Sequence, residues 1–101
     1  MEKSKISVIV YWVNIDDGGK TNLPINVPYY VITDPFKGLS NEEIRWSLVL
    51  EIDTNDEKDI KRVGIGKAYF LVEDAPSKLL VKGFSLKVYE GPKFVAIVEV
   101  I

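Results

Sequence analysis

The stretch that decides the fold class is Ile6-Ser7-Val8-Ile9-Val10-Tyr11-Trp12-Val13-Asn14-Ile15. Its alternate positions form two sets, and apolar side chains fill one set and nearly fill the other. The first set comprises Ile6, Val8, Val10 and Trp12, and the second comprises Ile9, Tyr11, Val13 and Ile15. This alternation is typical of a β-strand, and we expect a strand with two apolar faces to be covered on both sides. The segment that follows, Asp16-Asp17-Gly18-Gly19, tolerates positive φ and predicts a turn that reverses the chain.

Five more segments carry strand signals and are separated by turn residues. They are 29–33, closed by Asp34-Pro35, and 46–52, 67–73, 84–89 and 94–101. The segment Ser40-Asn41-Glu42-Glu43 has the spacing of a helix capping box, but the strand pattern resumes at Trp46 and leaves room for one helical turn. The polar stretch from Asp53 to Arg62 is the longest predicted loop.

Six strands without a long helix predict an all-β domain, either a small closed barrel or a sandwich. A barrel is favoured because the first and last strands are the most apolar, and free apolar edges promote aggregation. The 101 residues correspond to one domain, residues 1–101. We therefore predict a single closed β-barrel domain.

The composition argues against most catalytic chemistry. The chain contains no His and no Cys, which removes the imidazole base, the thiolate nucleophile, the disulfide and the metal sites built from these residues. With 47% hydrophobic and 28% charged residues it reads as globular. The net charge of −2 argues against general affinity for nucleic acid. The N-terminal residues lack the pattern of a secretory signal, and no apolar run is long enough to span a membrane. We expect a cytosolic protein that is not an enzyme.

Three motifs that suggest chemistry fail on inspection. The acidic segment that starts at Asp53 would need Gly and Glu where Lys58 and Gly64 stand if it were a calcium loop. Asp16 and Asp17 are neighbours on a turn, whereas a glycosidase needs carboxylates on facing walls of a cleft. Gly64-Ile65-Gly66 is not followed by the residues of a phosphate-binding loop. No catalytic residue, metal or cofactor is predicted.

The aromatic residues divide into core and surface candidates. The alternation places Trp12, Trp46 and Phe70 in the core. Tyr29 and Tyr30 are neighbours on a strand, so one ring should face outward, and Tyr89 has the phase of an exposed residue. Exposed aromatic rings beside lysines are typical of protein contact sites and also of base-stacking surfaces.

Two distant segments resemble one known family. The segment from Val10 to Thr21, Val-Tyr-Trp-Val-Asn-Ile-Asp-Asp-Gly-Gly-Lys-Thr, followed by Pro28-Tyr29-Tyr30, resembles the opening of the third domain of elongation factor Tu, which has an acidic residue, Gly-Gly-Arg and a Pro-aromatic strand. The segment from Gly83 to Ala96 resembles its closing hairpin, in which a strand ends in Glu-Gly-Gly-Arg. Between them, Val63 to Gly66 lies where the family has a Pro-Gly-Asp turn, so the resemblance covers nearly the whole chain.

The resemblance implies a six-stranded antiparallel Greek-key barrel. In that family the barrel contacts the nucleotide-binding domain, an exchange factor and the T-stem side of transfer RNA. The turns near the RNA correspond to Gly91 and Lys93 and to Gly18, Gly19 and Lys20. Lysine replaces arginine in both turns, and Pro92 removes a backbone donor, which argues against transfer-RNA binding.

We expect a binding module without catalysis whose partner is another cytosolic protein, as in a regulatory or immunity-type inhibitor. The predicted contact residues lie in two turns and on two strands: Asp16, Asp17, Gly18, Gly19, Lys20, Tyr29, Tyr89, Gly91 and Lys93. One alternative is a structured-RNA binder in translation, which predicts one patch formed by Lys20, Lys93 and Lys87. A further alternative, a hydrolase, predicts a deep pocket with a buried carboxylate or lysine. The oligomeric state stays open.

Overall fold

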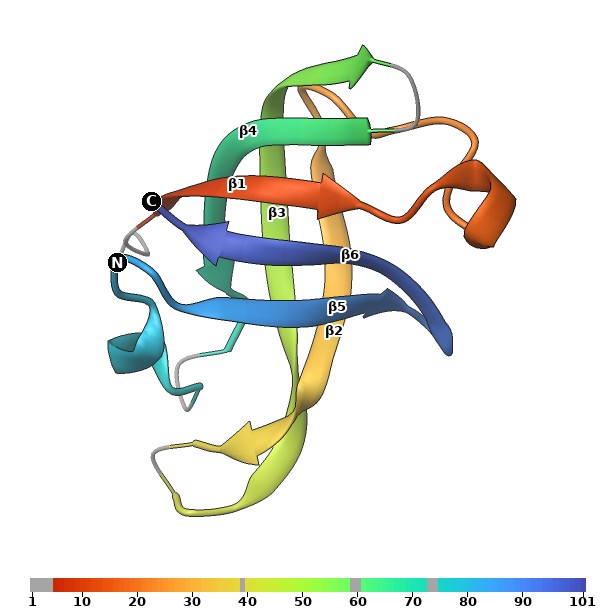
Figure 1. Ribbon diagram of the computed structural model, residues 1–101. Coiled ribbons are helices and arrows are strands. Elements are labelled where there is room, and N and C mark those ends of the chain that lie inside the picture. Colours follow the sequence, from red (N-terminus) through yellow and green to blue (C-terminus); the bar gives the residue numbers. More distant parts are fainter. Residues whose placement is uncertain (1–4, 39, 59–60, 73–74) are drawn as a thin grey trace.

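The computed structural model describes residues 5–38, 40–58, 61–72 and 75–101. Its strands are β1 (Ile6–Trp12), β2 (Pro28–Lys37), β3 (Glu43–Lys58), β4 (Lys61–Phe70), β5 (Ser85–Glu90) and β6 (Lys93–Val100), shown in Figure 1. Two three-residue 3-10 helices, η1 (Ile15–Asp17) and η2 (Ser77–Leu79), are the helices in these ranges. None of the described helices has the length and apolar character required to cross a membrane. The predicted all-β class is confirmed.

The strands close into a barrel in the order β1-β4-β3-β2-β5-β6, and every neighbouring pair is antiparallel. Closure depends on β1, which pairs with β4 on one side and with β6 on the other. Val10 thus lies opposite Gly64 of β4 and Val98 of β6. Since β1 lies beside β4 while β2, β3 and β4 follow one another, these four strands have a Greek-key order. The predicted closed six-stranded barrel is confirmed.

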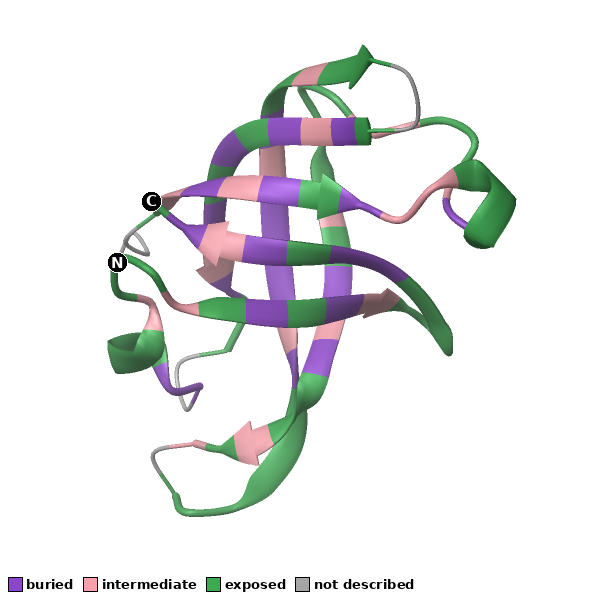
Figure 2. Ribbon diagram, viewed as in Figure 1, coloured by how far each residue is buried: buried purple, intermediate pink, exposed green. Residues whose placement is uncertain are grey.

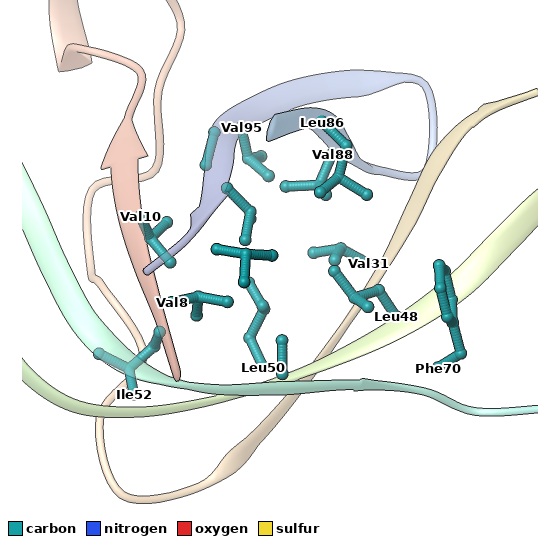
Figure 3. Packing of buried hydrophobic residues seen from close by; sticks show 14 of the residues in the cluster. Val8, Val10, Val31, Leu48, Leu50, Ile52, Phe70, Leu86, Val88 and Val95 are labelled. Atoms are coloured by element: carbon teal, nitrogen blue, oxygen red, sulfur yellow. The ribbon is translucent and has the colours of Figure 1, made fainter. Parts of the chain in front are cut away.

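The interior is filled by aliphatic side chains from all six strands. Figure 3 shows side chains of opposing walls, including Val8 and Val10 of β1, Leu48 and Leu50 of β3 and Val88 of β5, pointing into a shared core. The predicted core aromatics Trp12, Trp46 and Phe70 are all buried, which confirms those positions. Trp12 and Phe70 are the last residues of β1 and β4, so the core reaches the ends of these two strands.

The segment predicted as a loop, Asp53 to Arg62, is in fact part of a long β-hairpin. β3 continues to Lys58 and β4 begins at Lys61, with Asp56 opposite Val63 and Glu57 opposite Arg62; residues 59 and 60 lie outside the described ranges. The loop prediction was wrong because this hairpin extends past the apolar core. Its inward positions carry polar side chains, so the apolar alternation that marks a strand is missing.

Other boundaries differ from the prediction as well. The strand predicted over 67–73 ends at Phe70, and residue 73 lies outside the described ranges. β2 does not stop at Asp34-Pro35; a register shift between Ile32 and Pro35 lets it continue to Lys37 against Glu43. Proline is tolerated at such an irregularity because no regular ladder donor is required there. The capping-box segment 40–43 forms a bend with Asn41 at φ 64° and leads directly into β3, without a helical turn.

The second apolar set of β1 lies on the outer wall of the barrel. Figure 2 shows buried and more accessible residues alternating along β1, and Tyr11 is 42% exposed. The expectation that β1 is covered on both faces was therefore wrong within the described residues. A single closed barrel has one interior, so only the set that contains Val8 and Val10 can be buried in it.

Truncation of a core leucine tests this arrangement. Leu50→Ala should lower the free energy of unfolding by about 3 kcal/mol, because a buried side chain is removed and a cavity is left. Leu79→Ala is the matched control, since Leu79 lies on η2 and is exposed; its loss should stay below about 1 kcal/mol. Urea denaturation measures both, and equal losses would contradict the described core.

Candidate binding surface at one end of the barrel

The turn after β1 and the turn between β5 and β6 lie at the same end of the barrel. β1 and β6 are antiparallel, with Trp12 opposite Ala96, and the Val13 amide donates to the Val95 carbonyl at 2.9 Å. The end of β1 is therefore next to the start of β6. We call the surface formed by residues 14–20 and 90–93 the barrel tip; Figure 1 shows its two turns on the same side of the molecule.

A polar contact joins the two turns of the barrel tip. Lys20 Nζ lies 2.8 Å from Glu90 Oε1, and this salt bridge links residues 70 positions apart in the sequence. The Tyr29 hydroxyl donates to the same Glu90 oxygen at 2.5 Å. Lys20 Nζ also lies 5.0 Å from the centre of the Tyr29 ring, a distance suited to a cation–π interaction. The Glu90 carboxylate thus accepts hydrogen bonds from both the Lys20 ammonium and the Tyr29 hydroxyl.

These contacts set the protonation states of the group. The hydrogen bond from Lys20, followed by the hydrogen bond from Tyr29, lowers the pKa of Glu90 below its usual value. Burial, followed by the hydrogen bond to Glu90, raises the pKa of Tyr29 above its usual value. At neutral pH Glu90 is therefore an anion that accepts, and Tyr29 keeps the proton that it donates.

Arg62 fixes the first turn from inside the barrel. Its side chain is buried, with Nη1 donating to the Lys20 carbonyl at 2.6 Å and Nη2 donating to the Val13 carbonyl. Gly19 is required beside it, because a Cβ at that position would lie 1.9 Å from the Val13 oxygen. Gly18 follows η1 with φ 92°, a conformation that favours glycine. The guanidinium thereby holds both ends of the turn.

A second polar contact supports the tip from below. Trp12 Nε1 donates to Asn55 Oδ1 at 2.9 Å, and Asn55 Nδ2 donates to the Pro24 carbonyl at 3.0 Å. The Tyr29 ring packs against Trp12 with centroids 6.0 Å apart. Asn55 and Arg62 were missed as site residues in the sequence, since both stood in a predicted loop. Glu90 was the first residue of a predicted contact turn, but its pairing with Lys20 and Tyr29 was not predicted.

The structure brings most of the predicted contact residues together. Asp16, Asp17, Gly18, Gly91 and Lys93 are exposed at the barrel tip, Lys20 is half-buried and Gly19 is buried. Tyr29 is half-buried beneath them. The prediction that one of the two neighbouring tyrosines faces outward is confirmed, and that residue is Tyr30, which is 58% exposed.

Tyr89 is separate from the tip contacts. It faces outward on β5, as its phase predicted, but it is only partly exposed because its ring lies 5.7 Å from Phe94 and 4.7 Å from the guanidinium carbon of Arg45. A hydrogen bond with Asp34 raises the pKa of Tyr89. The ring is therefore held on the wall of the barrel.

The geometry offers binding groups on a fixed frame. Within the described residues, the buried polar or charged side chains are Thr33 and Arg62, and no three His, Cys, Asp or Glu residues are grouped so that they could hold a metal ion. A hollow beside the tip is lined by Tyr11, Trp12, Asn14, Lys61, Arg62 and Val63. The prediction that the protein is not an enzyme stays a prediction.

Comparison with known proteins found no family model, no curated protein and no solved structure that matches the chain. The barrel is thus established by the structure, while membership of a family is not.

Arg62→Met tests the internal support of the tip. It should lower the free energy of unfolding by about 2–4 kcal/mol, because the Val13 and Lys20 carbonyls lose their buried donors. Faster hydrogen exchange at the Gly19 amide should accompany this loss. Lys78→Met is the control, since Lys78 is an exposed cation on η2, and about 1 kcal/mol or less is expected. Unchanged exchange at Gly19 would contradict the role of Arg62.

The stability should depend on pH through Glu90 and Tyr29. Because the pKa of Glu90 is lowered by folding, its contribution is present above the ordinary carboxylate range and is lost as pH falls through the lowered value. Because the pKa of Tyr29 is raised, its contribution is present below about pH 10 and is lost as pH rises above that. Urea denaturation at a series of pH values measures the free energy of unfolding on the acid side, where Glu90 acts (the acid limb), and on the alkaline side, where Tyr29 acts. Glu90→Gln should flatten the acid limb, and an unchanged acid limb would rule out this contribution.

Proposed function

We propose that this protein is a binding module without catalysis, and that the barrel tip docks onto another protein. The observation that carries the proposal is the Lys20–Glu90 salt bridge, because it joins two distant turns into one surface before any partner arrives. Preorganised surfaces bind with a smaller loss of conformational entropy. Arg62 and Gly19 support the same surface from within.

The charges of the tip favour a protein partner over RNA. The tip carries three carboxylates, Asp16, Asp17 and Glu90, and the two ammonium groups of Lys20 and Lys93. Lys20 is already paired with Glu90, so it does not add a free cation to a basic patch. Phosphate binding requires clustered cations, whereas a mixed acidic surface suits a protein. A regulatory or immunity-type inhibitor of a cytosolic protein is the role that we propose for such a tip.

As part of the same proposal, we infer that this barrel is related to the third domain of elongation factor Tu. It is supported by the order of the two motifs and by the six-stranded antiparallel barrel in which both turns meet at one end. In that family the corresponding turns are contact surfaces. The relationship would therefore explain why the tip, rather than the interior, serves binding.

Affinity capture with a tip variant tests the proposal. The immobilised wild-type chain is compared with Asp16→Lys/Asp17→Lys/Lys93→Glu, in which three exposed side chains reverse their charge. The lysate comes from cells that express this chain. We expect the variant to retain at least about tenfold less of the partner protein than the wild type does. Isothermal titration with that purified protein should then give the same ratio.

Lys78→Glu is the matched control, because Lys78 is exposed on η2, outside the barrel tip. It should retain the partner as the wild type does. Equal retention by the tip variant would overturn the proposal. Retention that disappears after ribonuclease treatment, and that weakens as salt rises, would identify structured RNA as the partner instead.

A further inference from the structure

The hollow beside the barrel tip lies where β1 leaves β4. Among the described residues, the pairing of these strands ends at Tyr11 and Val63, although β4 already begins at Lys61. Beyond this pair the chain turns away from β4 into η1, as Figure 1 shows. Because Asn14 of the barrel tip also lines the hollow, the two surfaces are continuous. The space measures about 550 Å³ and is lined by Tyr11, Trp12, Asn14, Lys61, Arg62 and Val63.

Among the described residues that line the hollow, two are cations and none is acidic. Lys61 is exposed and takes part in no salt bridge of the described chain. Arg62 is 6% exposed; its Nη atoms bond to neutral carbonyl oxygens, and its Nε has no hydrogen-bond partner among the described residues. Asp16 and Asp17 of η1 are exposed and lie outside the lining. The buried charge of Arg62 is therefore not neutralised by a hydrogen-bonded carboxylate.

The charges of the neighbouring strand do not cancel those of the lining. Glu57 lies opposite Arg62, but its Oε1 is 3.8 Å from Nη1, beyond hydrogen-bond distance, and its side chain is 54% exposed. Such a pair contributes little. Asp56 and Lys58 stand opposite two lining residues of β4 and add one charge of each sign. With Lys61 included, three cations face two anions, and the hollow keeps a net positive charge.

The remaining lining groups suit a carboxylate on an apolar stem. Tyr11, Trp12 and Val63 supply apolar surface, and the Asn14 side chain makes no capping bond to η1, so its amide is available as a donor. An ammonium and an amide match the two oxygens of a carboxylate, whereas phosphate binding requires clustered cations. Aspartate and glutamate side chains carry both the carboxylate and a methylene stem that can lie against the apolar surface.

We propose that the hollow receives an aspartate or glutamate side chain of the protein that docks onto the barrel tip. This assignment rests on the proposed function, because it takes the carboxylate to belong to that partner. Lys61 pairs with the carboxylate at the rim, and the buried charge of Arg62 attracts it from a region of low dielectric constant. Charge complementarity of this kind fixes the register of a docked partner.

A blocked amino acid tests the hollow without the partner. N-acetyl-glutamic acid α-amide is titrated into the isotope-labelled chain and followed by NMR, with N-acetyl-glutamine amide as the neutral probe. The acid should shift the resonances of the Arg62 Nε–H and of the Asn14 and Val63 amides, with a dissociation constant in the millimolar range. The neutral probe should leave them in place. Lys61→Gln should weaken binding of the acid by about threefold, because an exposed ammonium is lost.

Lys78→Gln is the matched control, because it removes an exposed ammonium on η2, outside the hollow. It should bind the acid as the wild type does, and circular dichroism should show that both variants keep their fold. The absence of a saturable shift, or equal shifts with the neutral probe, would overturn the proposal. An equal loss in Lys78→Gln would overturn it as well, because the overall charge would then be what attracts the acid.

The captured partner tests the source of the carboxylate. Isothermal titration should give an affinity about threefold lower for Lys61→Gln than for the wild type or Lys78→Gln. An unchanged affinity for the partner, with the acid probe still bound, would overturn a partner side chain as the occupant and identify a free organic acid instead. If no partner is captured, the proposed function fails and this occupant fails with it, whereas the probe titration still decides whether the hollow binds a carboxylate.

Discussion

The double pairing of β1 is the constraint on which the rest of the structure depends. β1 hydrogen-bonds with β4 on one side and β6 on the other, and this closes the sheet. Closure protects the most apolar strands from pairing with other chains. It also creates a single interior, so the inward set of β1 is buried with Val10 while the outward set, with Tyr11, lies on the wall. The same pairing places the turn after β1 next to the turn before β6.

At the tip, polar side chains take over where the aliphatic core ends. Asn55 and Arg62 occupy inward positions of the β3–β4 hairpin and bind backbone carbonyls and the Trp12 indole. A buried guanidinium is unfavourable unless its hydrogens are bound, and here the Val13 and Lys20 carbonyls accept two of its bonds, while the buried Nε has no hydrogen-bond partner among the described residues. The requirement to satisfy Arg62 thereby orders the turn. Order of this kind is what a binding surface needs in order to keep its shape when unbound.

The molecule therefore presents two different surfaces. The barrel tip is charged, mostly polar and held by the Lys20–Glu90 pair, whereas the wall around Ile97 exposes the apolar side chains of Tyr11, Ile65 and Ile97. Tip and wall are built from different residues of the same strands, and β5 and β6 contribute to both.

The period-2 apolar pattern by itself predicted six strands, the all-β class and the burial of Trp12, Trp46 and Phe70, and the apolar first and last strands favoured a closed barrel over a sandwich. The two turns became contact candidates through the resemblance to elongation factor Tu, and that role stays a proposal. Only the tertiary structure decided that Asp53 to Lys58 is a strand, that Arg62 is buried, and that Glu90 joins Lys20 to Tyr29. The reason is physical: apolar periodicity reports burial against a core, and these polar residues are held by hydrogen bonds to partners that are distant in the sequence. Such bonds leave no local pattern, because their partners become neighbours only when the barrel closes.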